Sequence, residues 1–137
     1  MADKISPIIP FLRYNDPNAA VDWLVKAFDF EPVTVATGDD GTVVHAALRF
    51  GTGVVTLGPA GQGPLDVRSP RDLPAVNQGV YVHLDGDVDA HHARSTSAGA
   101  EVVIELQDME YGSREYAVRD PEGHIWSFGT YLPGAED

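Results

Sequence analysis

The chain has 137 residues, 43% of them hydrophobic, and no cysteine, so we expect one domain with an apolar core and neither disulfides nor cysteine chemistry. Its formal net charge of -12 at pH 7 makes nucleic acid an unfavourable partner and attracts cationic ligands, although an acidic surface also serves solubility alone. No apolar run approaches the ~20 residues of a membrane-spanning helix and the first residues do not resemble a signal peptide, so we expect a cytoplasmic protein without a membrane partner.

The first half of the chain predicts a strand, a helix and three further strands. Asp16 is a favourable helix N-cap, and Pro17 suits the first position of the helix. Apolar residues then recur at the i, i+3, i+4, i+7 spacing of an amphipathic helix, at Val21, Leu24, Val25 and Phe28. Asp39-Asp40-Gly41 indicates a hairpin turn, and Gly51-Thr52-Gly53 indicates a second turn before the strand VVTLG.

Residues 59–77 are rich in glycine and proline, which predicts a loop rather than a further module. The length of this segment exceeds the ~4–6 residues of an ordinary connection between elements. Two interpretations stay open. The segment is either a plain connector between the two halves or a flap that folds over a pocket.

The second half predicts the same order of elements. Asp87 or Asp89 would cap a helix that ends at Gly99, a residue that favours helix C-termini. The side chains of His91 and His92 diverge by about 100° on a helix, so they do not chelate one ion. We expect both histidines to have a structural role on a surface helix. The segment EVVIEL that follows is typical of a strand.

The two halves match at a constant offset of 70 residues. IIPFLRY corresponds to QGVYVHL, HAALRF to EYAVRD, and VVTLG to HIWSF. The turn Gly51-Thr52-Gly53 corresponds to Pro121-Glu122-Gly123. We therefore predict an α+β fold of two βαβββ modules in tandem, residues 5–58 and 78–132, joined by a connector at residues 59–77. The modules should pair, because one module alone cannot bury both faces of its sheet.

Three segments resemble the vicinal oxygen chelate superfamily of glyoxalases, bleomycin-resistance proteins and extradiol dioxygenases: FLRYNDPNAAVDWLVKAFDFEP, YVHLDGDVDAHHARSTSAGAEVV and YGSREYAVRDPEGHIWSFGTY. The third is similar to the PhnB-like branch, and the resemblance extends over residues 5–131. It implies curled, mixed four-stranded sheets that form a barrel-like cleft with the helices outside. It also implies a homodimer whose pocket is completed across the interface.

Metal-using members of this superfamily carry His, Gln or Glu ligands on the first and last strands of each module. The resemblance places these ligand positions at Ile9, Leu57, Gly79 and Ser127. None of the four is an ordinary ligand of a divalent ion, so we predict no metal and no cofactor. A shift of one residue in strand register would exchange the faces of the strands. The last strands would then present Thr56 or Trp126, which make no metal centre either.

Side chains alternate between the two faces of a strand, which separates a core face from a cleft face. Leu12, Tyr14, Tyr116 and Val118 suit the core face, under the helices. The predicted cleft has apolar walls and a few polar groups, as small-molecule sites do: Phe11, Arg13, His45, Val55, Leu57, Tyr81, His83, Glu115, Ile125 and Ser127. Arg13 would bind a carboxylate or phosphate, or pair with an acidic residue between the modules.

These features favour a protein that binds a small organic molecule, cationic or aromatic, in a metal-free concave cleft, as bleomycin-resistance-type proteins sequester an antibiotic. One alternative is a metal-dependent or acid-base lyase, isomerase or dioxygenase of the same superfamily. In that case His45, His83 and Glu115 are the candidate catalytic residues or metal ligands. Another alternative is a non-catalytic regulatory or interaction module. Tyr111 and Arg114 lie in a segment that would close one mouth of the cleft or make a plain loop contact.

Overall fold

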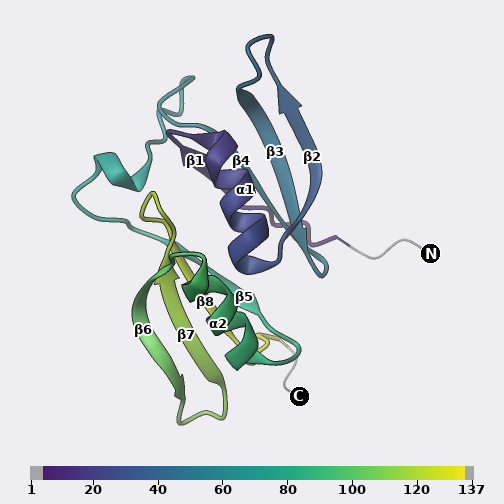
Figure 1. The fold of residues 1–137 in the computed structure, drawn as a ribbon, viewed down its shortest axis with the longest axis vertical. Coiled ribbons are helices and arrows are strands. Elements are labelled where there is room, and N and C mark those ends of the chain that lie inside the picture. The colour runs from purple at the N-terminus through teal and green to yellow at the C-terminus, as the bar shows by residue number, and fades with distance from the viewer. Residues whose placement is uncertain (1–4, 135–137) are drawn as a thin grey trace.

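The order of one strand, one helix and three strands occurs twice in the computed structural model, which describes residues 5–134 (Figure 1). The first module contains β1 (Phe11–Tyr14), α1 (Pro17–Phe28), β2 (Glu31–Thr37), β3 (Val43–Phe50) and β4 (Gly53–Pro59). The second module contains β5 (Gly79–His83), α2 (Val88–Ser97), β6 (Glu101–Asp108), β7 (Arg114–Arg119) and β8 (Ile125–Gly129). A short 3-10 helix, η1 (Pro70–Asp72), lies in the connector between them.

Each module folds into one four-stranded mixed sheet. The strand orders are β1-β4-β3-β2 and β5-β8-β7-β6. The first strand of each module pairs in parallel with the last strand, and the other pairs are antiparallel. The predicted α+β fold with two tandem modules is confirmed, although neither sheet closes into a barrel. Neither helix in the described part of the chain is long and apolar enough to cross a membrane.

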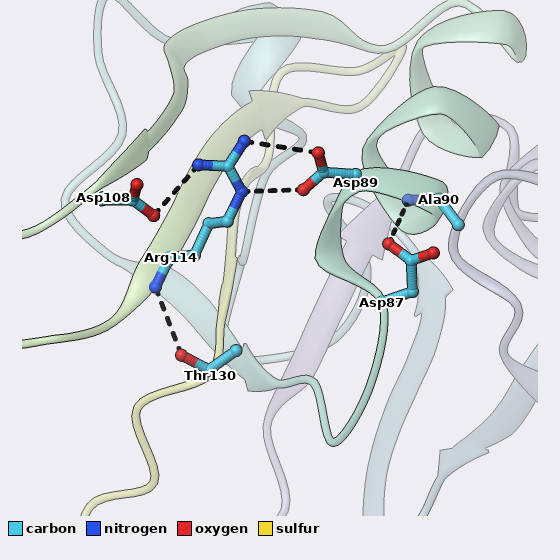
Figure 2. Close-up of polar contacts among 6 residues, drawn as sticks. All are labelled: Asp87, Asp89, Ala90, Asp108, Arg114 and Thr130. Carbon is cyan, nitrogen blue, oxygen red and sulfur yellow. Dashed lines mark hydrogen bonds and ion pairs between the residues drawn. The ribbon is translucent and has the colours of Figure 1, made fainter.

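Both helices begin at an aspartate whose side chain caps the free backbone N–H groups. The Asp16 carboxylate accepts from the N–H three residues later at 3.0 Å, and Pro17 follows it in the first turn, as predicted. α2 begins after Asp87, whose carboxylate accepts from the N–H of Ala90 at 3.0 Å (Figure 2). Of the two caps considered for this helix, Asp87 is therefore the one used. Asp89 lies in the first turn instead.

α1 lies over the first sheet and α2 over the second (Figure 1), and the two helices pack against each other above a core that both modules share. Phe28, at the end of α1, is fully buried. Its ring centroid lies 5.3 Å from that of Trp126 and 4.7 Å from that of Phe128, both on β8 of the other module. Aromatic pairs at such separations bury large areas and attract each other. This cluster therefore holds the modules together.

The turn after β7 supplies two buried carboxylates that bind the first module. The Tyr14 hydroxyl donates to Asp120 Oδ2 at 2.6 Å, and the Trp126 indole N–H donates to the same oxygen at 3.0 Å. Burial and the charge of Asp120 raise the pKa of Tyr14 well above its usual value, so the hydroxyl stays protonated and donates. Glu122 accepts from the backbone N–H of Asn15 at 2.7 Å. The turn therefore links the two modules.

The connector is fastened to this same turn. Ser69 is fully buried, and its Oγ donates to Glu122 Oε1 at 2.5 Å. A guanidinium N–H of Arg71 donates to the Pro121 carbonyl at 3.1 Å. These bonds give the connector a fixed path along the junction of the modules, where Val76 lines a groove.

His91 of α2 points into the shared core. Its Nε2 lies 3.0 Å from the Phe28 carbonyl oxygen, which can only accept, so we place the proton on Nε2. Nδ1 then accepts from the Tyr116 hydroxyl at 2.6 Å. Burial lowers the pKa of His91 and raises the pKa of Tyr116 to about 12. His91 thus connects α1, α2 and β7 through hydrogen bonds.

Candidate functional site

Each sheet presents one open face, on the side away from the helices. The strand register places Phe11 beside Thr56 in the first sheet and Tyr81 beside Ser127 in the second. Phe11 is 50% exposed, whereas the next residue, Leu12, is 8% exposed and belongs to the core. Side chains on the open faces are therefore the ones that a ligand can reach.

Equivalent residues build the two open faces. A row across the first sheet consists of Phe11, Thr56 and Ala47, and the matching row across the second consists of Tyr81, Ser127 and Ala117. The next row contains Arg13, Gly58 and His45 in the first module and His83, Gly129 and Glu115 in the second. Each half therefore offers a floor of small residues between an aromatic ring and polar groups. The two halves differ in charge, because Glu115 occupies the position of His45.

The strand face predicted for Val55 and Leu57 is wrong. Leu57 is fully buried and pairs with Leu12 on the core face, and Val55 is 9% exposed on the same face, where it lines a groove between the modules. The other predicted residues lie on the open faces by strand register and alternation: Phe11, Arg13, His45, Tyr81, His83, Glu115, Ile125 and Ser127. That these residues bind a ligand stays a prediction.

The error comes from the turn before the last strand of each module. The register partners Arg49 and Val54 are five positions apart, whereas the equivalent partners Arg119 and Ile125 are six apart. The offset between the modules therefore changes from 70 to 71 in the last strand. A slip of one residue exchanges the two faces of a strand, so Thr56 occupies the open-face position.

The four positions that hold a metal in metal-using relatives are Ile9, Thr56, Gly79 and Ser127 in this corrected register. They offer an alkyl group, two hydroxyls and no side chain at all. Tight protein sites for Zn²⁺ and similar divalent ions are built from imidazole, carboxylate or thiolate donors, so this set does not fit one. In residues 5–134, no three His, Cys, Asp or Glu side chains form a group that could hold a metal ion.

Two glycines let side chains lie flat across the last strands. A Cβ at Gly58 would lie 2.8 Å from Arg13 Nη1, and a Cβ at Gly129 would lie 2.5 Å from Glu115 Cγ and 2.8 Å from the Tyr81 hydroxyl oxygen. Any larger residue would displace these groups. Neither glycine was predicted from the sequence as a site residue. The sequence does carry a signal for them, because a glycine inside a strand marks a place where another group lies close to the backbone.

In the first module, the open face carries an aromatic-cation pair. The Arg13 guanidinium carbon lies 5.3 Å from the centroid of the Phe11 ring. In the described part of the chain, no carboxylate forms an ion pair with Arg13. The Arg13 carbonyl accepts from His124 Nε2 at 2.9 Å, so this histidine links β1 to the second module.

In the second module, three tyrosines gather around Glu115. The Tyr81 hydroxyl donates to the Tyr131 carbonyl at 2.7 Å, and the Tyr111 hydroxyl donates to Glu115 Oε1 at 2.9 Å. His83 Nδ1 lies 3.3 Å from the Tyr131 carbonyl as well. Partial burial raises the pKa of Tyr81, and the hydrogen bond to Glu115 raises the pKa of Tyr111. Tyr131 was not singled out from the sequence, because it follows the last strand and fits no periodic pattern.

Grooves of about 810 and 570 Å³ lie between the modules, and Pro10 and Val80 line both of them. The larger groove is mostly apolar and is lined by residues that include Ile8, Phe50, Val54, Tyr81, His83 and Leu132. The smaller groove is lined by residues that include Phe11, Arg13, Arg68, Val76, Gly79 and Ile125. The connector forms a wall of the smaller groove, and this groove is the one that it would cover if it acts as a flap. Small-molecule sites have this size and composition.

Residues 4–128 match the family model described as "Glyoxalase/Bleomycin resistance protein/Dioxygenase superfamily". The chain is also 37% identical over 131 residues to an uncharacterised protein of Mycobacterium bovis, an alignment that covers 94% of this chain and 86% of the relative.

Two solved structures show the same fold. TioX from Micromonospora sp. ML1 is 38% identical, with a TM-score of 0.71 over 93% of this chain and 99% of TioX. A glyoxalase/bleomycin resistance protein from Streptomyces sp. CB03234 is 21% identical, with a TM-score of 0.66 over 90% of this chain and 98% of that chain. The second likeness concerns the fold alone.

Proposed function

Because the chain belongs to the glyoxalase/bleomycin resistance protein/dioxygenase superfamily, we propose that it is a binding protein that holds a small organic molecule on its open faces without metal chemistry. The observation that carries this proposal is the row of small residues on each open face. Thr56 lies there beside the exposed ring of Phe11, and Ser127 lies beside the half-buried ring of Tyr81. Small hydroxyl residues beside aromatic rings suit the stacking of a flat organic group better than the ligation of an ion.

The charge of the protein narrows the class of ligand. A net charge of -12 favours the approach of cationic compounds, and the aromatic rings favour planar ones. Sequestration of an antibiotic with these properties is the specific form of the proposal. The acid-base alternative rests on His45, His83 and Glu115, but His45 lies in the first module and the other two lie in the second.

We also propose that the protein is a homodimer in which the open faces are completed by the partner. Apolar side chains on the outer strands stay exposed, with Val33 and Val35 at 55% and 45%, and Val103 and Ile104 at 44% and 47%. These side chains lie on the edge strands of the two sheets, and exposed apolar side chains of this kind commonly mark interaction surfaces. A second copy would cover these strands and deepen the grooves.

A neutral aromatic probe tests the binding function. N-hexyl dansylamide, whose fluorescence rises in an apolar site, should bind saturably to the wild-type protein. Ser127→Phe would place a ring on the floor beside Tyr81 and should weaken binding at least tenfold. Ser97→Phe, on the exposed end of α2, is the matched control and should bind like the wild type. Absence of saturable binding, or equal binding by Ser127→Phe, would contradict the proposal.

A further inference from the structure

The open face of the second module contains a compact group of aromatic rings and one carboxylate. We call Tyr81, Tyr111, Tyr131 and Glu115 the tyrosine cluster. Their rings lie close together, since the centroid of Tyr131 is 6.5 Å from that of Tyr81 and 5.9 Å from that of Tyr111. Three separate segments supply these rings: β5, the turn between β6 and β7, and the chain after β8. The cluster is therefore a product of the fold and not of one local motif.

The carboxylate in this cluster has no cation beside it. Its neighbour on β7, Arg114, is bound by Asp89 at 2.7 Å and by Asp108 at 3.0 Å (Figure 2). Those two carboxylates raise the pKa of Arg114 and satisfy its guanidinium. Within residues 5–134, no Lys, Arg or His forms an ion pair with Glu115. The Glu115 carboxylate can therefore pair with a cation that a ligand supplies.

The cluster is preformed and borders the larger groove at Tyr81. Gly129 leaves room for Glu115 and the Tyr81 hydroxyl to cross β8. The Tyr111 hydroxyl fixes the carboxylate through its hydrogen bond. Tyr81 also lines the larger groove, together with Leu132, so an apolar body in the groove would end at the cluster. Groups that are already held in place lose little entropy when a ligand binds.

We propose that the tyrosine cluster binds the ammonium group of an organic cation whose apolar body lies in the larger groove. This inference rests on the binding function proposed above and adds the chemical class of the ligand and its orientation. Aromatic faces attract cations, most strongly where water is partly excluded, and Glu115 supplies the opposite charge. In the first module the position of Glu115 carries His45, and the ring of Phe11, which corresponds to Tyr81, already faces the Arg13 guanidinium, so this module does not attract a cation. The ammonium end is therefore directed to the second module.

Two probes of matched shape test this inference. One is a dansylamide with a propyl-trimethylammonium chain, and the other carries the neutral 4,4-dimethylpentyl chain of nearly the same shape. The full-length wild-type protein should bind the cationic probe at least tenfold more tightly than the neutral one. Glu115→Gln should lower this ratio at least threefold, and the aromatic rings should maintain the remaining preference. Tyr111→Phe, which keeps the ring, should retain more of the ratio than Tyr111→Ala.

Asp22→Asn is the control for net charge, because Asp22 is exposed on α1 and the substitution removes the same charge as Glu115→Gln. It should leave the ratio unchanged, and thermal melting should show that every variant is folded. Equal affinity of the wild type for the two probes, or an unchanged ratio in Glu115→Gln, would overturn the inference and leave the binding function intact. Failure of both probes to bind would instead contradict the binding function itself.

Discussion

A buried tyrosine and a buried carboxylate form the strongest polar link between the modules. Tyr14 is 1% exposed and Asp120 is 4% exposed, and the hydroxyl donates to the carboxylate at 2.6 Å. The backbone N–H groups of Glu122 and His124 also donate to Asp120. Carboxylates buried in this way depend on their hydrogen bonds, because the desolvated charge has no other compensation.

Tyr14→Phe should therefore lower the free energy of unfolding by about 1.5–3 kcal/mol, the range for loss of a hydrogen bond to a buried charge. Urea denaturation at pH 7 measures this change. Tyr111→Phe removes an exposed hydroxyl that also donates to a carboxylate and serves as the control, with an expected change below about 0.5 kcal/mol. Similar losses in both variants would show that the buried link contributes nothing beyond an exposed one.

His91 makes the stability of the protein depend on pH. Because burial lowers its pKa in the folded state, the unfolded chain takes up a proton at a higher pH than the folded protein does. Stability should be fully present above the unfolded pKa of about 6.5 and should fall as pH decreases below it. His91→Gln should show a smaller loss of stability between pH 7 and pH 5.5 than the wild type, in urea denaturation. His92→Gln should retain the wild-type loss, and an equal loss in His91→Gln would refute this account.

At the level of elements, glycines in the last strands set the positions of the side chains that cross them. Gly129→Ala would bring a methyl group to 2.5 Å from Glu115 Cγ, so the tyrosine cluster must shift. We expect this variant to lose at least threefold of the preference for the cationic probe, measured by dansyl fluorescence. Gly38→Ala, outside both grooves, is the control, because its Cβ would meet only Asp40 Oδ1 at 3.6 Å and Val44 Cγ1 at 3.8 Å. Unchanged preference in Gly129→Ala would show that the cluster does not need this close approach.

The elements themselves were predictable because each depends on local signals. The Asp16 cap and the spacing of apolar residues fix α1, and alternation assigned the faces of β1, β3, β5 and β7 correctly. The face predicted for β4 was wrong, because the register of two paired strands depends on the length of the turn that joins them. The constant offset of 70 concealed the extra residue before β8. A repeat in the sequence therefore did not guarantee equal register.

For the whole molecule, the arrangement of the modules and the tyrosine cluster could not be predicted. Alternation placed Tyr81 and Glu115 on the cleft face, but the approach of Tyr111 and Tyr131 depends on how two loops fold back. The packing of α1 against α2 likewise depends on contacts such as Phe28 with Trp126. These contacts join residues that are far apart in the sequence and follow no period.

Native mass spectrometry with elemental analysis, on protein purified without added metal, tests the central claim most directly. A metal-free homodimer of the 14.7 kDa chain, which takes up the dansyl probe and is unaffected by chelators, is the predicted result. One tightly bound divalent ion per chain would contradict the claim. In that case residues other than Ile9, Thr56 and Ser127 would hold the metal ion.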